Sequence, residues 1–246
     1  MNLLCLSTAE QGCSLAIADG KNLLCEEFWT DRQTHSKRIL KMIEHMLEKR
    51  VCMEIDDIDG FVAAKGPGSF TGLRIGISVI QGMAKALDKP AAGVSSLDGI
   101  AFRFKYCSIP VCVMMDARRD EVYCAVYKFE QGHLVSKSQE IVTNPEKIIE
   151  MTNGSEEILF AGSGSKVYKS TIEQKADNPI ITNDFQDHVS AAVMINSLNL
   201  KNEQNFKDDF FNNPENILTP SYIRKSDAQL HFDLGKQKKT RILTKG

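Results

Sequence analysis

Residues 66–76 read Gly66-Pro67-Gly68-Ser69-Phe70-Thr71-Gly72-Leu73-Arg74-Ile75-Gly76. A candidate strand, 58–64, precedes this stretch, and a long segment without a breaker, 71–87, follows it. A glycine loop between a strand and a helix can hold an anion on its backbone N–H groups, or it can be a tight turn that lets the helix pack closely. The loop matches neither a Walker motif nor a Gly-x-Gly-x-x-Gly fingerprint, because no Gly-Lys-Ser/Thr follows and the glycine spacing differs.

The segment 71–87 has signals of both a strand and a helix. Its apolar residues alternate from Leu73 to Val79, but its length and its Ala-Lys-Ala-Leu end favour a helix. As a helix it has two apolar faces, one formed by Leu73, Ile77, Ile80, Ala84 and Leu87, and the other by Gly72, Ile75, Gly76, Val79 and Met83. One face can cover the chain's own sheet, so the second face is expected to meet another partner.

Two glycines lie one turn apart on that second face. Gly72 and Gly76 each cost a helix roughly 1 kcal/mol relative to alanine. A close helix–helix contact is the natural compensation, because small residues let two backbones approach. On this interpretation, Gly76→Leu leaves the monomer folded and breaks the contact with the partner.

The order of hairpin strands, helix, strand, glycine loop and helix occurs twice. The first copy has its loop at residues 66–68, and the second has Gly162-Ser163-Gly164 about 100 residues later. A duplicated α/β architecture with two lobes is the simplest explanation. We expect a first lobe over residues 1–105 and a second over 106–224, with the last helical part able to return to the first lobe. Residues 225–246 form a basic tail, expected to be a solvated terminus or, alternatively, a contact for RNA phosphate or a partner.

Composition narrows the class of protein. Hydrophobic residues make up 42% and charged residues 25% of the 246 residues, with a formal net charge of −2, so a disordered chain and a nucleic-acid-coating protein are excluded. No apolar run approaches the ~18 residues that span a bilayer, and the N-terminus does not resemble a signal peptide. Seven cysteines without a Cys-x-x-Cys pair indicate buried free thiols in a reducing compartment. We therefore expect a cytoplasmic protein without membrane contact.

The expected cleft between the lobes is poorly equipped for phosphoryl transfer. Phosphotransferases of a duplicated two-lobed design place carboxylates from both lobes there to hold a metal. The second lobe offers Asp116 at a strand exit, but the equivalent position of the first lobe is Ser7, with Glu10 and Asp19 near it only in sequence. No histidine pattern predicts a metal site, and Ser69 lacks a Gly-x-Ser-x-Gly frame, so a hydrolase is also disfavoured.

Several motifs together resemble the TsaB family of bacterial proteins, also called YeaZ. Residues 66–76 match the family's hallmark, and the resemblance covers nearly the whole chain. Further matches are His35 with Arg38-Ile39-Leu40, Gly93-Val94-Ser95-Ser96-Leu97, Asp116-Ala117-Arg118, Glu121-Val122-Tyr123 and Pro220-Ser221-Tyr222-Ile223-Arg224. One departure is Ser7, because the family usually has Asp at that strand exit.

The resemblance implies an α/β fold of the actin-like, Hsp70-like and sugar-kinase type, made of two ribonuclease-H-like lobes. It also implies a non-catalytic role in making threonylcarbamoyladenosine in tRNA. In the family, TsaD transfers the threonylcarbamoyl group, TsaC-type enzymes supply it and TsaE is an ATPase of the complex. The implied partners are TsaD, TsaE and a second copy of the chain, with tRNA reached through the complex. No metal and no cofactor are implied for the chain alone, although ATP or ADP can bind in the complex.

The implied interface lies on the helices that begin near His35 and at Thr71. For this interface we select ten residues: His35, Arg38, Ile39, Met42, Met46, Gly72, Ile75, Gly76, Val79 and Met83. The alternatives are a phosphotransferase or ATPase of the same fold, which would need a carboxylate at Ser7, and a protease, which no motif supports.

Overall fold

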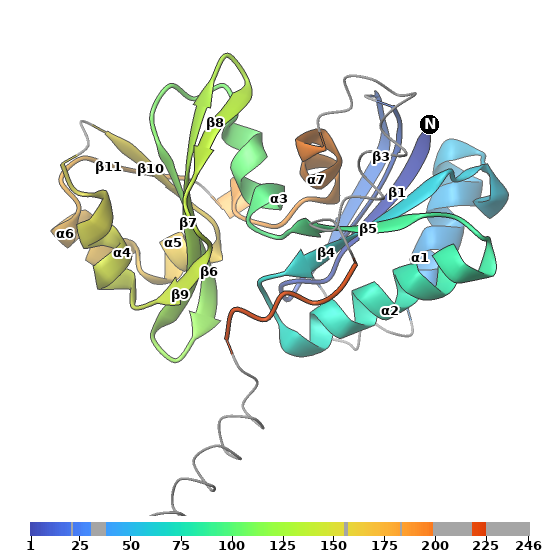
Figure 1. Cartoon of the computed structure of the whole chain (residues 1–246), viewed down its shortest axis with the longest axis horizontal. Coiled ribbons are helices and arrows are strands. Elements are labelled where there is room, and N and C mark those ends of the chain that lie inside the picture. Colours follow the sequence, from blue (N-terminus) through green and yellow to red (C-terminus); the bar gives the residue numbers. More distant parts are fainter. Residues whose placement is uncertain (21, 31–37, 155–156, 183, 199–217, 225–246) are drawn as a thin grey trace, which may run out of the picture.

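The computed structural model describes residues 1–20, 22–30, 38–154, 157–182, 184–198 and 218–224. They form two lobes, each built on a mixed α/β sheet (Figure 1). The first sheet has the order β3-β2-β1-β4-β5, with antiparallel pairing among β1 to β3 and parallel pairing of β4 with β1 and β5. Its strands are β1 (Asn2–Ser7), β2 (Cys13–Asp19), β3 (Asn22–Trp29), β4 (Gly60–Gly66) and β5 (Ala91–Ser95).

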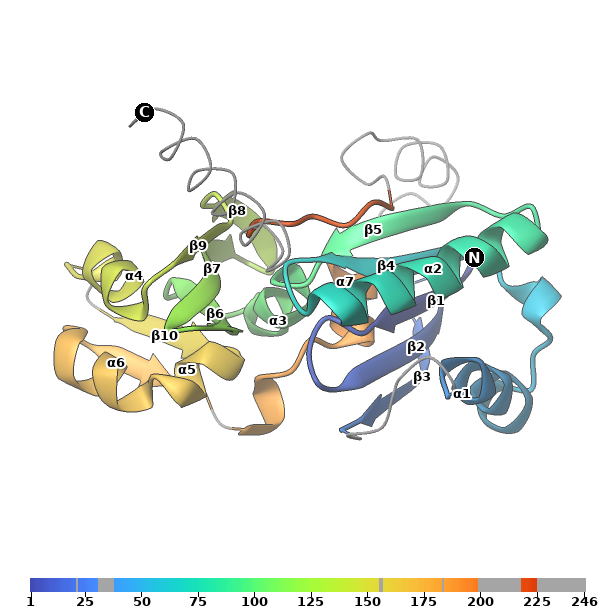
Figure 2. The same cartoon turned by 90° about the horizontal axis from the view of Figure 1, so that it is seen from below.

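Helices cover both faces of this first sheet. On one face, α2 (Phe70–Ala86) packs on β4 and β1, and α1 (Ile39–Met46) buries Ile39, Ile43 and Met46 in the same core. The chain continues from α1 through the π turn Leu47–Val51 and the 3-10 turn Ile55–Asp57. On the opposite face, α7 (Ala191–Ser197) packs on β2 and β1, so a late segment of the chain completes the first lobe (Figures 1 and 2).

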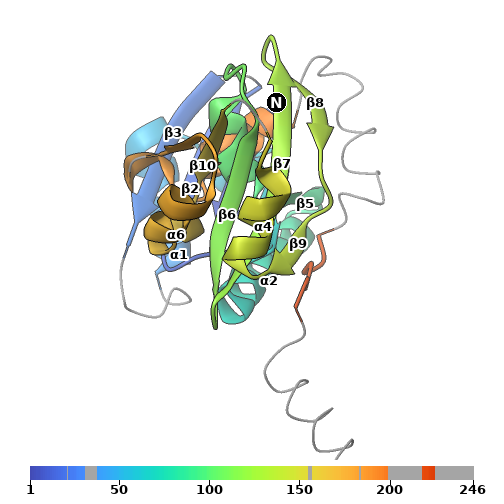
Figure 3. The same cartoon turned by 90° about the vertical axis from the view of Figure 1, so that its left-hand side faces the viewer.

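The second sheet has the order β11-β10-β6-β7-β8, and β9 also pairs with β7 (Figure 3). Helices α4 (Pro145–Thr152) and α6 (Lys169–Lys175) pack together, and α5 (Ser163–Val167) contacts β6. A 3-10 turn, Asp184–Gln186, follows the sheet. The strands are β6 (Val111–Arg118), β7 (Glu121–Glu130), β8 (His133–Lys137), β9 (Ile141–Thr143), β10 (Ile158–Ala161) and β11 (Pro179–Ile181).

Successive side chains of β6 point alternately into two hydrophobic clusters. Val111, Val113 and Met115 join the large cluster that also contains the first lobe's strands, whereas Cys112 and Met114 face a smaller cluster under α4 and α6. A strand buried on both faces is expected to be apolar at every position, as residues 111–115 of β6 are. Between the sheets lie α3 (Asp98–Ala101) and the 3-10 turn Phe102–Phe104, which contact α7. The two lobes are therefore packed together through one continuous core.

Several local predictions are confirmed. Segment 71–87 is a helix, and Ser69 caps it by accepting a hydrogen bond from the Gly72 N–H at 3.2 Å. Asn144 caps α4 with Pro145 in the first turn. The expected burial of the cysteines is confirmed in part: Cys5, Cys13, Cys112 and Cys124 are buried, Cys25 and Cys107 are half-buried, and Cys52 is exposed. No helix among the described residues is long and apolar enough to cross a membrane.

Candidate functional site

The glycine-rich stretch packs α2 against the β1–β2 turn of the same lobe. A Cβ atom on Gly72 would lie 2.1 Å from the Thr8 carbonyl oxygen, and one on Gly76 would lie 2.3 Å from Thr8 Oγ1. The Thr8 hydroxyl donates to the Gly72 carbonyl at 2.7 Å, and the Ser69 N–H donates to the Ala9 carbonyl at 2.7 Å. The expected helix–helix explanation of these glycines is therefore wrong. Gly76→Leu would place its side chain against Thr8 of the same chain, so this variant is expected to destabilise the monomer rather than leave it intact.

The outer face of α2 is open and has an apolar edge. Thr71, Ser78 and Gly82 are exposed along its centre, and a Cβ on Gly82 would meet no described atom within 4 Å. Ile75, Val79 and Met83, all half-buried, form an apolar stripe along one edge. A mid-helix glycine costs roughly 1 kcal/mol, and no intrachain contact within the described residues compensates for it at Gly82. We call this surface, from Thr71 to Met83, the α2 face.

Residues 218–224, here called the strap, border the opposite edge of the α2 face (Figure 2). Gln81 Nε2 donates to the Leu218 carbonyl at 2.8 Å, and the Ser221 N–H donates to the Lys65 carbonyl at 2.6 Å. At its other end, Arg224 Nη1 donates to the Ala117 carbonyl at 3.0 Å and to Glu121 Oε2 at 2.9 Å. The strap therefore connects α2 of the first lobe to the β6–β7 turn of the second.

The ten residues selected for the interface separate into groups. Ile75, Val79 and Met83 lie on the α2 face, Met42 is half-buried on α1, and Arg38 is exposed just before α1. His35 lies outside the described residues. The selection of Ile39, Met46, Gly72 and Gly76 needs correction, because the first two are 1% and 0% exposed in the core and the two glycines face Thr8. Helical periodicity identifies an apolar stripe but not which of its edges is exposed.

A half-buried glutamate bridges the two lobes. Glu10 Oε1 accepts a 2.6 Å hydrogen bond from the Ser163 hydroxyl, and Glu10 Oε2 accepts one of 3.2 Å from the Val189 N–H. Ser163 Oγ in turn accepts from the Asp116 N–H at 3.0 Å. Burial raises the pKa of Glu10, and the nearby Asp187 carboxylate adds to this increase, against the hydrogen bonds from Ser163 and Val189. Glu10 lies close to Ser7 in the sequence, but no sequence pattern indicated its contact with Ser163.

Ser7 and Asp116, at corresponding strand ends of the two lobes, do not supply a pair of carboxylates. Ser7 is buried at the end of β1, and its Oγ accepts from the Ala9 N–H at 3.5 Å, while Asp116 Oδ1 accepts from the Arg118 N–H at 2.8 Å. The described residues contain no group of three His, Cys, Asp or Glu side chains placed to hold a metal ion.

Glu10 gives the unfolding free energy a specific pH dependence. Its folded pKa is raised above the unfolded value, so stability falls as the pH rises from the unfolded to the folded pKa. We expect Glu10→Gln to remove this fall, measured as urea-unfolding free energies from about pH 4 to pH 8. Glu44→Gln, at an exposed position of α1, is the control, and equal pH slopes for wild type and Glu10→Gln would contradict the assignment.

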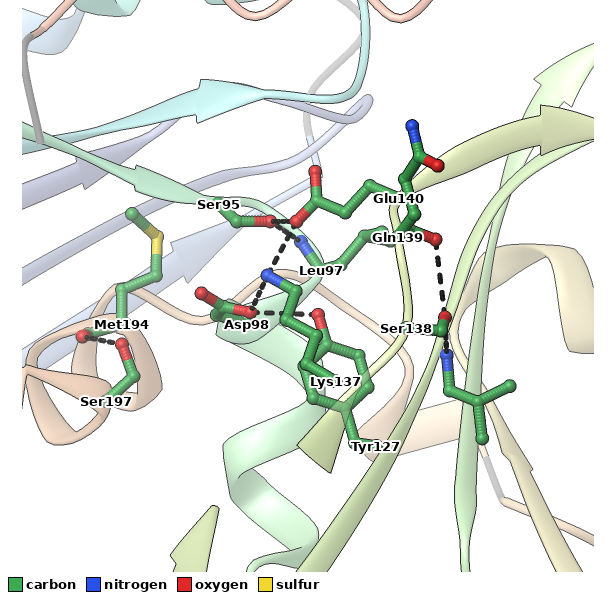
Figure 4. Close-up of polar contacts among 11 residues, drawn as sticks. Ser95, Leu97, Asp98, Tyr127, Lys137, Ser138, Gln139, Glu140, Met194 and Ser197 are labelled. Atoms are coloured by element: carbon green, nitrogen blue, oxygen red, sulfur yellow. Dashed lines mark hydrogen bonds and ion pairs between the residues drawn. The ribbon is translucent and has the colours of Figure 1, made fainter. Parts of the chain in front are cut away.

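A network of five side chains ties the lobes together on another side (Figure 4). Asp98 Oδ1, at the start of α3, accepts from the Tyr127 hydroxyl at 2.8 Å and from Lys137 Nζ at 2.7 Å. Lys137 Nζ also lies 2.7 Å from Glu140 Oε1, which accepts from the Ser95 hydroxyl at 2.5 Å. Burial opposes the charge of Lys137, but the carboxylates of Asp98 and Glu140 outweigh it and raise the Lys137 pKa. We call these residues the junction network.

Comparisons with known proteins identify the family of this chain. A family model described as TsaD, tRNA N6-adenosine threonylcarbamoyltransferase, matches residues 24–232. Two relatives named tRNA threonylcarbamoyladenosine biosynthesis protein TsaB are similar in sequence. The Escherichia coli protein is 35% identical over 169 residues, covering 67% of this chain and 72% of the relative. The Bacillus subtilis protein is 29% identical over 178 residues, covering 70% and 76%.

Solved structures show the same architecture. YeaZ from Pseudomonas aeruginosa has a TM-score of 0.70 and 26% identity, covering 90% of this chain and 99% of that one. An inorganic polyphosphate/ATP-glucomannokinase from Arthrobacter sp. strain KM has a TM-score of 0.51 and 11% identity, covering 82% and 99%. The second likeness shows the fold alone, and it confirms the predicted two-lobed actin-like and sugar-kinase fold. The chain belongs to the TsaB (YeaZ) family, within the wider family that the threonylcarbamoyltransferase model describes.

Proposed function

We propose that this chain is a non-catalytic cytoplasmic subunit in tRNA threonylcarbamoyladenosine biosynthesis. It binds TsaD through the α2 face and supports it together with TsaE, and two copies of the chain pair through the same face. The observation that carries the proposal is Gly82, a glycine in mid-helix with open space around it and an apolar stripe beside it. A helix of a partner can approach the backbone at that point.

Support for a non-catalytic role comes from the contacts between the lobes. Glu10 bridges the lobes, and Ser7 stands where a metal-binding carboxylate would be required. The strap and the junction network also connect the lobes. Enzymes that close on a substrate need mobile parts, and these contacts oppose lobe movement. We propose no cofactor or metal for the chain alone, and we assign ATP or ADP to the complex.

The test is to mix the purified chain with its cognate TsaD and to measure mass by light scattering on a sizing column. We expect a one-to-one complex that replaces a homodimer, which would also show that both pairings use one surface. The absence of a complex would overturn the binding role. Threonylcarbamoyl transfer to tRNA by the chain alone would overturn the non-catalytic role.

Gly82→Leu is expected to weaken pairing without harming the monomer. A leucine at the point of closest approach overpacks the contact by about 1–3 kcal/mol, which is roughly a 5- to 150-fold increase in Kd. Within the monomer the new side chain meets open space, so the melting temperature should not fall. Lys128→Leu, on an exposed position of β7, is the control. Unchanged binding of TsaD by Gly82→Leu would place the contact elsewhere.

A further inference from the structure

An arginine at the edge of the α2 face is held in a fixed position. The guanidinium carbon of Arg74 lies 3.9 Å from the centroid of the Phe70 ring, so the charged group stacks on the aromatic face. Arg74 Nε donates a 2.9 Å hydrogen bond to the Tyr222 hydroxyl. The Phe70 and Tyr222 rings themselves pack with centroids 4.8 Å apart. An exposed arginine normally samples many rotamers, but this one is restrained from two sides.

The strap fixes the tyrosine that holds this arginine. Hydrogen bonds hold the strap on both sides of Tyr222. The Ser221 N–H donates to the Lys65 carbonyl, and Arg224 Nη1 donates to the Ala117 carbonyl and to the Glu121 carboxylate. Tyr222 is 41% exposed, so its ring covers Phe70 while its edge faces solvent. The stack therefore joins α2 to the strap at the border of the α2 face.

Arg74 has no acidic partner among the described residues. No carboxylate oxygen there lies within 4 Å of its guanidinium, and its hydrogen bond to Tyr222 uses Nε, which leaves the terminal nitrogens as donors. A planar guanidinium with two parallel donors matches a carboxylate in bidentate geometry. A positioned charge at a docking border, without a partner in the described part of the chain, is typical of a residue that is completed by the other protein.

We propose that Arg74, held by Phe70 and Tyr222, receives an aspartate or glutamate from the protein that covers the α2 face. The inference rests on the proposed function for the identity of that face. A protein carboxylate is favoured over RNA phosphate, because Arg74 and Lys85 are the cations on α2 and the stripe beside them is apolar. The α2 sequence contains no Asp or Glu, so an α2 helix from a second copy offers no carboxylate. On this basis Arg74 is expected to favour an acidic partner over a homodimer that pairs α2 with α2.

The experiment compares charge variants in binding to purified cognate TsaD and in homodimer formation. We expect Arg74→Glu to raise the Kd for TsaD by more than about 30-fold, to change the homodimer Kd by less than about threefold, and to keep the wild-type melting temperature. Lys85→Glu removes the other cation of the same helix and is the matched control, expected to have less than about a threefold effect. Arg74→Lys should be intermediate, because an ammonium cannot form the bidentate pair.

Tyr222→Phe tests whether the Tyr222 hydroxyl positions Arg74 for binding. This variant keeps the ring that packs on Phe70 but removes the acceptor of the Arg74 Nε–H. It should raise the Kd for TsaD about threefold, and it should have no further effect in an Arg74→Leu background. Additive effects would overturn the proposal that Tyr222 acts through Arg74.

The outcomes separate this inference from the proposed function. If wild type does not bind TsaD, the proposed function fails. If wild type binds and Arg74→Glu binds equally well, the carboxylate contact is wrong while the proposed function stands. Loss of affinity for a tRNA probe with unchanged TsaD binding would identify phosphate as the contact and overturn the proposal.

Discussion

Gly72→Ala is expected to lower the free energy of unfolding by about 3 kcal/mol or more. The added methyl group would lie 2.1 Å from the Thr8 carbonyl oxygen, and that oxygen belongs to the backbone of the β1–β2 turn. Relief requires α2 to move away from the turn, which weakens the hydrogen bond from the Thr8 hydroxyl to the Gly72 carbonyl. Urea unfolding monitored by circular dichroism measures the change.

The same substitution ten residues later on the same helix is the control. Gly82→Ala places its methyl group in open space, so only helix propensity changes. We expect unfolding free energy to rise by about 0.5–1 kcal/mol, opposite in sign to Gly72→Ala. A neutral Gly72→Ala, or equal effects at both positions, would contradict the close packing of α2 on Thr8.

Lys137→Met is also expected to have a large effect. It should lower the free energy of unfolding by about 3 kcal/mol at pH 7. The substitution keeps the length of the side chain but leaves the carboxylates of Asp98 and Glu140 without their shared cation. The Lys137 side chain is only 26% exposed, so water replaces the lost contact poorly. Because the folded pKa of Lys137 is raised, its stabilisation is complete below the unfolded pKa and disappears only as the pH rises through the folded value.

Lys128→Met is the matched control, because Lys128 is exposed on β7, next to the strand position of Tyr127. Its effect on urea unfolding should stay within about 0.5 kcal/mol. A second variant, Asp98→Asn with Lys137→Met, should recover part of the loss, since one of the two unpaired carboxylates is removed. An equally small effect of Lys137→Met and Lys128→Met would show that the junction network adds little stability.

The elements and their order could be predicted from the sequence, because periodicity and turn residues act locally. The helix after the glycine loop, the cap at Asn144 and the duplicated two-lobed order are of this kind. The contacts that define the site are not local. Glu10 and Ser163 are 153 positions apart, and Arg74 and Tyr222 are 148 apart, so no spacing rule connects them. The role of Gly72 was misassigned for the same reason, because its neighbour is the backbone of a distant turn, which has no side-chain signature.

Because the strap follows both lobes in the sequence, the order of synthesis decides when the border of the α2 face is completed. A ribosome completes the N-terminal part first, and domains generally begin to fold as they emerge. Helix α2 precedes residues 218–224 by more than a hundred positions, so Phe70 and Arg74 have no tyrosine beside them until the strap has been made. The border that we assign to a partner is therefore completed only after both lobes exist. Until then, a nascent chain would offer a partner an unfinished surface.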